Sequence, residues 1–139
     1  MSGHDRPFVY PPMTPETELG VDIYRTIPLS TLEALDRYLV SGIYPGGALD
    51  SVLTNNLLAA VRNGDEAFQR SLVALVRYLC NRCPMMAWGS EDRVADWVLL
   101  HDYDRKRNFL RHCSHGEYMA RRRQQAVDFA ASCRNNDKA

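Results

Sequence analysis

The sequence predicts an all-α fold: a single compact domain of five or six helices with an extended, proline-rich N-terminal arm. Large apolar residues recur at three- and four-residue intervals between Ile27 and Leu100, which is the spacing of helices that bury one face. Capping residues precede these segments, and Gly, Asn or Pro residues follow them. The chain has 139 residues, 45% hydrophobic and 24% charged, and this size and composition are typical of one globular domain.

The chain divides into three parts by composition. Residues 1–26 form the predicted arm, because each proline fixes its own φ and favours an extended residue before it. Its clustered prolines are Pro7, Pro11, Pro12 and Pro15. Residues 27–103 are the predicted helical core. Residues 104–139 carry nine Arg or Lys and four acidic residues, and we expect them to form a basic helical segment packed on the core.

The first predicted core helix begins at Ser30. Ser30 and Glu33 have the S-x-x-E spacing of a capping box, and Gly42 is expected to end the helix. Its apolar face is formed by Leu32, Leu35, Tyr38 and Leu39. The following turn, Tyr44 to Gly47, combines a proline with two glycines, which favours a rigid reversal of the chain.

Three capping residues and one proline mark the predicted ends of the later core helices. Asn55 is expected to cap a short helix whose buried face is Leu57, Leu58 and Val61. Asp65 is expected to begin the longest core helix, and Pro84 prevents it from continuing. Ser90 is expected to cap the next helix. The intervening loop residues Met85, Met86 and Trp88 are apolar, so we expect them to pack on the helices.

Two cysteines at the end of the longest core helix have the spacing of a zinc-binding pair. Cys80 and Cys83 form a C-x-x-C motif, and His112, Cys113 and His115 could complete a tetrahedral site. We prefer buried, reduced thiols, because the second group lacks tight spacing and thiols pack well in a helical core. A thioredoxin-like motif would follow a strand, whereas a helix precedes this one. The prediction is therefore that no metal and no cofactor is bound.

Two further polar motifs fit catalysis less well than helix ends. His115-Gly116-Glu117 matches the H-x-E of zinc deaminases, but the cysteine pair precedes it in the chain, which is the wrong order. His101-Asp102 matches the pair of helical metal-dependent phosphohydrolases, but the chain offers few further His and Asp ligands. Neither a nucleotide-binding loop nor a serine-hydrolase motif is present in the sequence. We predict no catalytic residue and no enzymatic activity.

The expected binding residues are aromatic or basic, because interfaces are enriched in aromatic residues and Arg. They are Tyr44, Trp88, Arg105, Lys106, Arg107, Arg111, Arg121, Arg122 and Arg123. A partner protein, or a second copy of the chain in a homo-oligomer, is the preferred occupant. The alternative is a nucleic-acid-binding regulator that uses residues 104–123, since basic side chains neutralise phosphates. The formal net charge of the whole chain is zero, which is unusual for a dedicated nucleic-acid binder.

Four segments of the core carry a resemblance to a known group of proteins. They are IPLSTLEALDRYLVSGIYPGG, LDSVLTNNLLAAV, LVRYLCNRCP and WGSEDRVADWV. Over about residues 27–98, their spacing resembles that of small uncharacterised proteins encoded by tailed phages and prophages. The resemblance implies a phage accessory protein acting in an infected bacterium, and it carries over no activity. The sequence has no apolar run long enough to span a bilayer and no signal-peptide pattern, so we expect a location in the host cytoplasm and no membrane partner.

Overall fold

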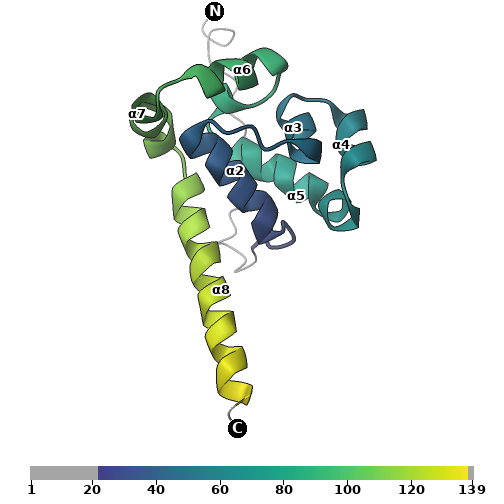
Figure 1. Cartoon of the computed structure of the whole chain (residues 1–139), viewed down its shortest axis with the longest axis vertical. Helices are drawn as coiled ribbons and strands as arrows, with labels where there is room; N and C mark the ends of the chain where they lie inside the picture. The colour runs from purple at the N-terminus through teal and green to yellow at the C-terminus, as the bar shows by residue number, and fades with distance from the viewer. Residues whose placement is uncertain (1–21, 138–139) are drawn as a thin grey trace, which may run out of the picture.

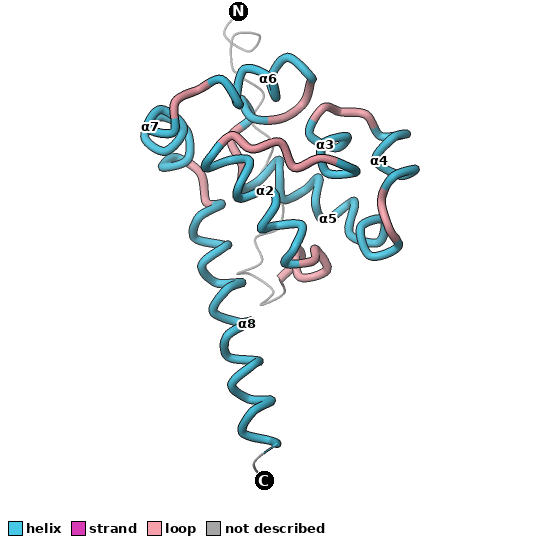
Figure 2. The backbone as a smooth tube through the Cα atoms, in the orientation of Figure 1, coloured by secondary structure: helices cyan, strands magenta, loops and turns pink. Residues whose placement is uncertain are grey.

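The computed structural model describes residues 22–137, shown in Figures 1 and 2, and this range is helical without a β-strand. The all-α prediction is therefore confirmed. Seven α-helices are present in the described range: α2 (Leu29–Ser41), α3 (Gly47–Leu53), α4 (Leu57–Asn63), α5 (Glu66–Arg82), α6 (Glu91–Leu99), α7 (Asp102–Asp104) and α8 (His115–Asp137). Three short helical turns connect them: η2 (Met85–Ala87), η3 (Arg105–Phe109) and η4 (Leu110–His112). Of the predicted arm, residues 1–21 lie outside the described range, and residues 22–26 form turns.

The helices form a body from which the end of α8 projects. In Figure 1, α2 and α5 lie in the middle of the body, α3 and α4 lie on one side, α7 lies on the opposite side, and α6 lies along the top. Helix α2 contacts α6, η3 and α8. The C-terminal part of α8 runs away from the body (Figure 1).

The buried core confirms the predicted face of α2. The fully buried side chains of α2 are Leu32, Leu35, Tyr38 and Leu39. Helix α6 is attached to this face by Trp97, whose indole N–H donates to the Tyr38 carbonyl at 3.2 Å. The Tyr38 hydroxyl donates to the carbonyl of Ala87 at 2.7 Å and so fixes η2. Each of these polar groups is satisfied inside the core, as burial requires.

Two predicted helix caps are wrong. Ser30 lies inside α2, whose N-cap is Pro28 with no side-chain capping bond; the helix begins earlier because proline has no N–H to satisfy and fits a helix start. The cap of α4 is Asn56, which accepts from the Ala59 N–H at 3.1 Å. Its neighbour Asn55 instead has a left-handed backbone with φ of 65°.

Four other predicted helix boundaries are confirmed. Asp65 accepts from the Phe68 N–H at 2.8 Å, and Ser90 accepts from the Arg93 N–H at 3.2 Å. Gly42 ends α2 in the left-handed conformation, with φ of 67°, and its N–H donates to the Tyr38 carbonyl. Helix α5 ends at Arg82, just before Pro84.

The predicted buried face of α4 is wrong. Its residues Leu57, Leu58 and Val61 are 63%, 78% and 45% exposed, and Ala60 is the buried residue of this helix. Helix α4 packs mainly on α3 at the edge of the body, so a small side chain suffices for the contact. The loop residues Met85 and Met86 are also exposed, whereas Trp88 is half-buried.

Within the described range, none of the helices is both long enough and apolar enough to cross a membrane.

Candidate functional site

The connection between α6 and α8 has an unusual backbone. After Leu100 adopts an extended conformation, α7 makes one turn, η3 is a five-residue π-helix, and η4 is a short 3-10 turn. Single π-helical turns are rare and are frequent at functional sites. We refer to residues 99–111 as the connecting segment.

Arg105 attaches the connecting segment to the end of α2. It is 3% exposed, its guanidinium donates to the Leu100 carbonyl, and it pairs with the Asp102 carboxylate at 3.0 Å. The same guanidinium lies against Gly42, where an added Cβ would overlap it. Arg105 is predicted to lie on a binding surface, but it is buried between the connecting segment and the end of α2. Its role is therefore to hold the connecting segment in place.

The outer face of the connecting segment carries exposed apolar and basic side chains. Leu99 and Tyr103 are 82% and 61% exposed. The guanidinium of Arg107 lies 5.6 Å from the centre of the Tyr103 ring and donates to the Tyr103 hydroxyl. Lys106 and Arg111 are also exposed. We refer to these five residues as the outer face of the connecting segment.

A shallow hollow of about 340 Å³ lies beside this face and is lined by residues 99–103. Tyr and Arg are among the side chains that contribute most at protein interfaces, and the exposed Leu99 adds apolar area beside them. Because Tyr103 and Arg107 already contact each other, a partner would meet a pair whose side chains are partly ordered before binding.

The predicted arginines of α8 have a different role. Arg122 donates to the carbonyls of Tyr24 and Ile27, at 3.2 and 2.7 Å, and so holds the chain just before α2. Arg121 lies 5.4 Å from the centre of the Tyr118 ring. The structure therefore does not bring these side chains together with Lys106, Arg107 and Arg111.

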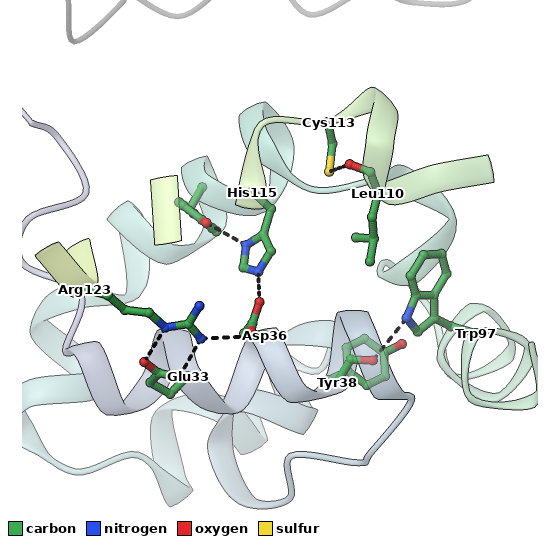
Figure 3. A network of polar contacts seen from close by, with 9 residues as sticks. Glu33, Asp36, Tyr38, Trp97, Leu110, Cys113, His115 and Arg123 are labelled. Carbon is green, nitrogen blue, oxygen red and sulfur yellow. Dashed lines mark hydrogen bonds and ion pairs between the residues drawn. The ribbon is translucent and has the colours of Figure 1, made fainter. Parts of the chain in front are cut away.

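Arg123 belongs to a polar network that attaches α8 to α2 (Figure 3). Its guanidinium bridges Glu33, at 2.8 and 3.0 Å, and Asp36, at 3.0 Å. The Nε2 of His115 lies 2.9 Å from the other oxygen of Asp36, and its Nδ1 lies 2.6 Å from the Tyr78 hydroxyl. Residues from α2, α5 and the start of α8 therefore form one chain of hydrogen bonds.

Hydrogen bonds in this network lower the pKa values of its two carboxyl groups. The hydrogen bond from His115 is the main reason why the pKa of Asp36 is lowered, with a smaller contribution from Arg123. The hydrogen bond from Arg123 lowers the pKa of Glu33. Burial raises the pKa of the Tyr78 hydroxyl. At neutral pH the two carboxylates are therefore ionised and the tyrosine is neutral.

A carboxylate, a histidine and a hydroxyl in series also occur in nucleophilic catalysis. Here, His115 is 1% exposed and Tyr78 is fully buried. Both ring nitrogens of His115 have partners, so neither nitrogen has room for a substrate atom. The arrangement acts as a docking contact for α8. The sequence suggests His115 only as a possible metal ligand and does not reveal this role, because its partners Asp36 and Tyr78 are distant in the chain.

The four cysteines differ in exposure. Cys83 is buried, Cys80 and Cys113 are half-buried, and Cys133 is exposed. Burial raises the pKa of the thiols of Cys80, Cys83 and Cys113. Across residues 22–137, the structure shows no group of three or more His, Cys, Asp or Glu side chains placed to hold a metal ion.

The two remaining predicted binding residues lie outside the connecting segment. Tyr44 is 54% exposed in the loop before α3, and Trp88 is half-buried after η2. The outer face therefore contains three of the nine predicted residues, Lys106, Arg107 and Arg111. Leu99 of this face was not predicted to bind, and its exposure could not be read from apolar spacing.

Comparisons with models of protein families, with curated proteins and with solved structures find no match to this chain.

Proposed function

We propose that this chain is a non-catalytic, phage-encoded accessory protein that binds and modulates a host or phage protein in the host cytoplasm. The proposed binding surface is the outer face of the connecting segment. The observation that carries the proposal is the contact between Tyr103 and Arg107 beside the exposed Leu99. The phage origin rests on the resemblance of residues 27–98 described above.

Two features support this surface over the others. The first is its rigid base, because Arg105 fixes the segment to the end of α2 through buried contacts. A surface held in one shape loses less conformational entropy on binding. The second is its composition, because Tyr103 and Arg107 are of the two residue types that, with Trp, are enriched in interface hot spots, and Leu99 adds exposed apolar area beside them.

The test is affinity capture of the tagged chain from infected bacteria, followed by identification of the captured protein. The informative variant is Tyr103→Ala with Arg107→Ala, which removes both side chains of the contact. Its matched control is Leu58→Ala with Arg62→Ala, an exposed pair at the same four-residue spacing in α4, at the opposite end of the body (Figure 1). We expect the first variant to lose the partner and the control to retain it. Equal capture by both variants would contradict the proposal.

A nucleic-acid-binding regulator is the second candidate, supported by the exposed Lys106, Arg107 and Arg111. It predicts that binding to duplex DNA or RNA weakens steeply as salt rises. Replacing these three residues by Ala would reduce the slope of that salt dependence. The other predicted basic residues contribute less, because Arg105, Arg122 and Arg123 bind groups of the same chain. The absence of binding at low salt would exclude this candidate.

A further inference from the structure

The C-terminal half of α8 is not covered by the body. From Arg123 to Asn135 every side chain is exposed except Ala131, which is half-buried. The free half, residues 124–137, is 14 residues long and therefore extends for about 21 Å. An isolated helix of this length is only marginally stable in water, so contacts with another molecule would stabilise it.

One side of the free half is apolar. Ala126, Phe129, Ala130 and Cys133 are spaced as i, i+3, i+4 and i+7, so they lie along one side of the helix. We refer to these four residues as the α8 stripe. Successive residues of an α-helix are rotated by about 100°. The stripe therefore lies on the same side of α8 as His115, Tyr118 and Met119, which are buried against the body. The docked face of α8 therefore continues past the edge of the body as an uncovered apolar stripe.

We infer that the α8 stripe pairs with the same stripe of a second copy of this chain, in an antiparallel two-helix contact. The stripe consists of one large side chain, Phe129, surrounded by the small residues Ala126, Ala130 and Cys133. Such a surface is complementary to itself, because the ring of one copy fits over the small residues of the other. A two-fold contact requires this kind of self-complementarity.

Charge also favours a second copy. The stripe itself carries no charge between Ala126 and Cys133. Asp128 lies on the far side of the helix, where its carboxylate accepts from the Gln124 side chain at 2.9 Å. Two identical stripes would therefore meet without burying a charge and without opposing like charges. The stripe has no charged side chain that could pair with a strongly charged partner.

The position of the body determines the direction of pairing. The body lies on the same side of α8 as the stripe and ends near Arg123, whose side chain contacts α2. In a parallel pair, with helix axes about 8–10 Å apart, the two bodies would occupy the same space. An antiparallel pair places the bodies at opposite ends, and the free halves can then overlap along their whole length. At full overlap, Phe129 of each copy lies level with residues 132–133 of the other.

The test is sedimentation velocity of the full chain over a wide range of concentrations. We expect a reversible dimer, and a weak one, because a two-helix contact of this length is smaller than the interfaces of stable complexes. Phe129→Glu places a charge in the stripe and should raise the dissociation constant at least tenfold. The matched control is Val127→Glu, which changes another exposed apolar residue, 58% exposed against 72% for Phe129, about 160° around α8 from Phe129 and should leave the dissociation constant unchanged.

The second readout is cross-linking of Cys133, which is exposed, with a short bismaleimide. We expect Cys133–Cys133 cross-linked dimers in the unmodified chain and in Val127→Glu, and a loss of them in Phe129→Glu. Three results would overturn the inference: a monomer at every concentration, a dimer that Phe129→Glu leaves intact, or a dimer that Val127→Glu weakens equally. A monomer whose Cys133 is unreactive would show that the stripe is covered from within one chain, which also contradicts pairing.

Discussion

The Nε2 of His115 lies 2.9 Å from a carboxylate oxygen of Asp36, and this contact joins the first turn of α8 to the middle of α2 across 79 residues of sequence. The imidazole is almost completely buried, whereas the carboxylate is partly open to solvent. The Tyr78 hydroxyl holds the other ring nitrogen at 2.6 Å. His115 therefore fixes the first turn of α8 by satisfying two partners at once, and Arg122 and Arg123 add contacts further along the helix.

Replacing His115 by Ala should destabilise the fold by about 3 kcal/mol, because it leaves the buried Tyr78 hydroxyl and the Asp36 carboxylate without their partner. The measurement is the free energy of unfolding from urea titrations followed by circular dichroism. His112→Ala is the control, because His112 is exposed and its loss should change the free energy by less than about 0.5 kcal/mol. Equal effects of the two substitutions would contradict the docking role of His115.

The contribution of Asp36 to stability should depend on pH. Its pKa is lower in the folded chain than its ordinary value of about 4. The stabilisation is therefore complete above the ordinary pKa and is lost as the pH falls through the folded value. Asp36→Asn should be less stable than the unmodified chain at neutral pH, and this difference should shrink between about pH 5 and pH 3.

The measurement is the free energy of unfolding of both chains at several pH values. Asp96→Asn is the control, because Asp96 is exposed on α6 and its replacement should produce no pH-dependent difference. If the difference between the unmodified chain and Asp36→Asn is the same at every pH, the charge of Asp36 does not stabilise the fold.

Gly42→Ala should destabilise the fold more than Gly47→Ala does. Both glycines have a positive φ, 67° and 59°, so each alanine incurs the backbone strain of a left-handed residue, about 1–2 kcal/mol. Only at Gly42 would the new Cβ also overlap the Arg105 guanidinium, since Gly47 has open space around it. Urea unfolding of the two variants isolates the cost of that overlap. Equal losses would show that Arg105 moves aside at little cost.

The two predicted caps that differ in outcome can be compared directly. Asp65→Ala should reduce the free energy of unfolding by about 1 kcal/mol, because Asp65 caps α5 through the Phe68 N–H. Ser30→Ala should have almost no effect, because Ser30 lies inside α2 and makes no capping bond. Alanine also has the higher helix propensity. Thermal or urea unfolding distinguishes the two variants. A loss of about 1 kcal/mol in Ser30→Ala would show that Ser30 caps the helix, as the capping-box spacing predicts.

The helical class and most of the core followed from apolar spacing, since the faces of α2, α5 and α6 are strongly periodic. The exposed face of α4 could not be predicted, because Leu57, Leu58 and Val61 have the same spacing as buried residues. Burial depends on what lies opposite a helix, and for α4 only the small Ala60 faces the body. Spacing identifies a helix and its apolar side but does not provide the neighbour that covers it.

The binding surface was predicted in part for a similar reason. A run of basic residues indicates a charged surface, but it does not indicate which side chains have partners in the same chain. Arg122 and Arg123 bind residues far away in sequence, such as Ile27 and Glu33. Arg105 binds Leu100 and Asp102 and lies against Gly42. Lys106, Arg107 and Arg111 remain exposed. Only the three-dimensional arrangement separates these two groups.

Hydrogen–deuterium exchange of the chain with and without its captured partner tests the proposed binding surface most directly. The account predicts that the partner slows exchange in residues 99–111 and leaves residues 57–63 in α4 unchanged. Protection of other parts of the chain without protection of residues 99–111 would contradict it.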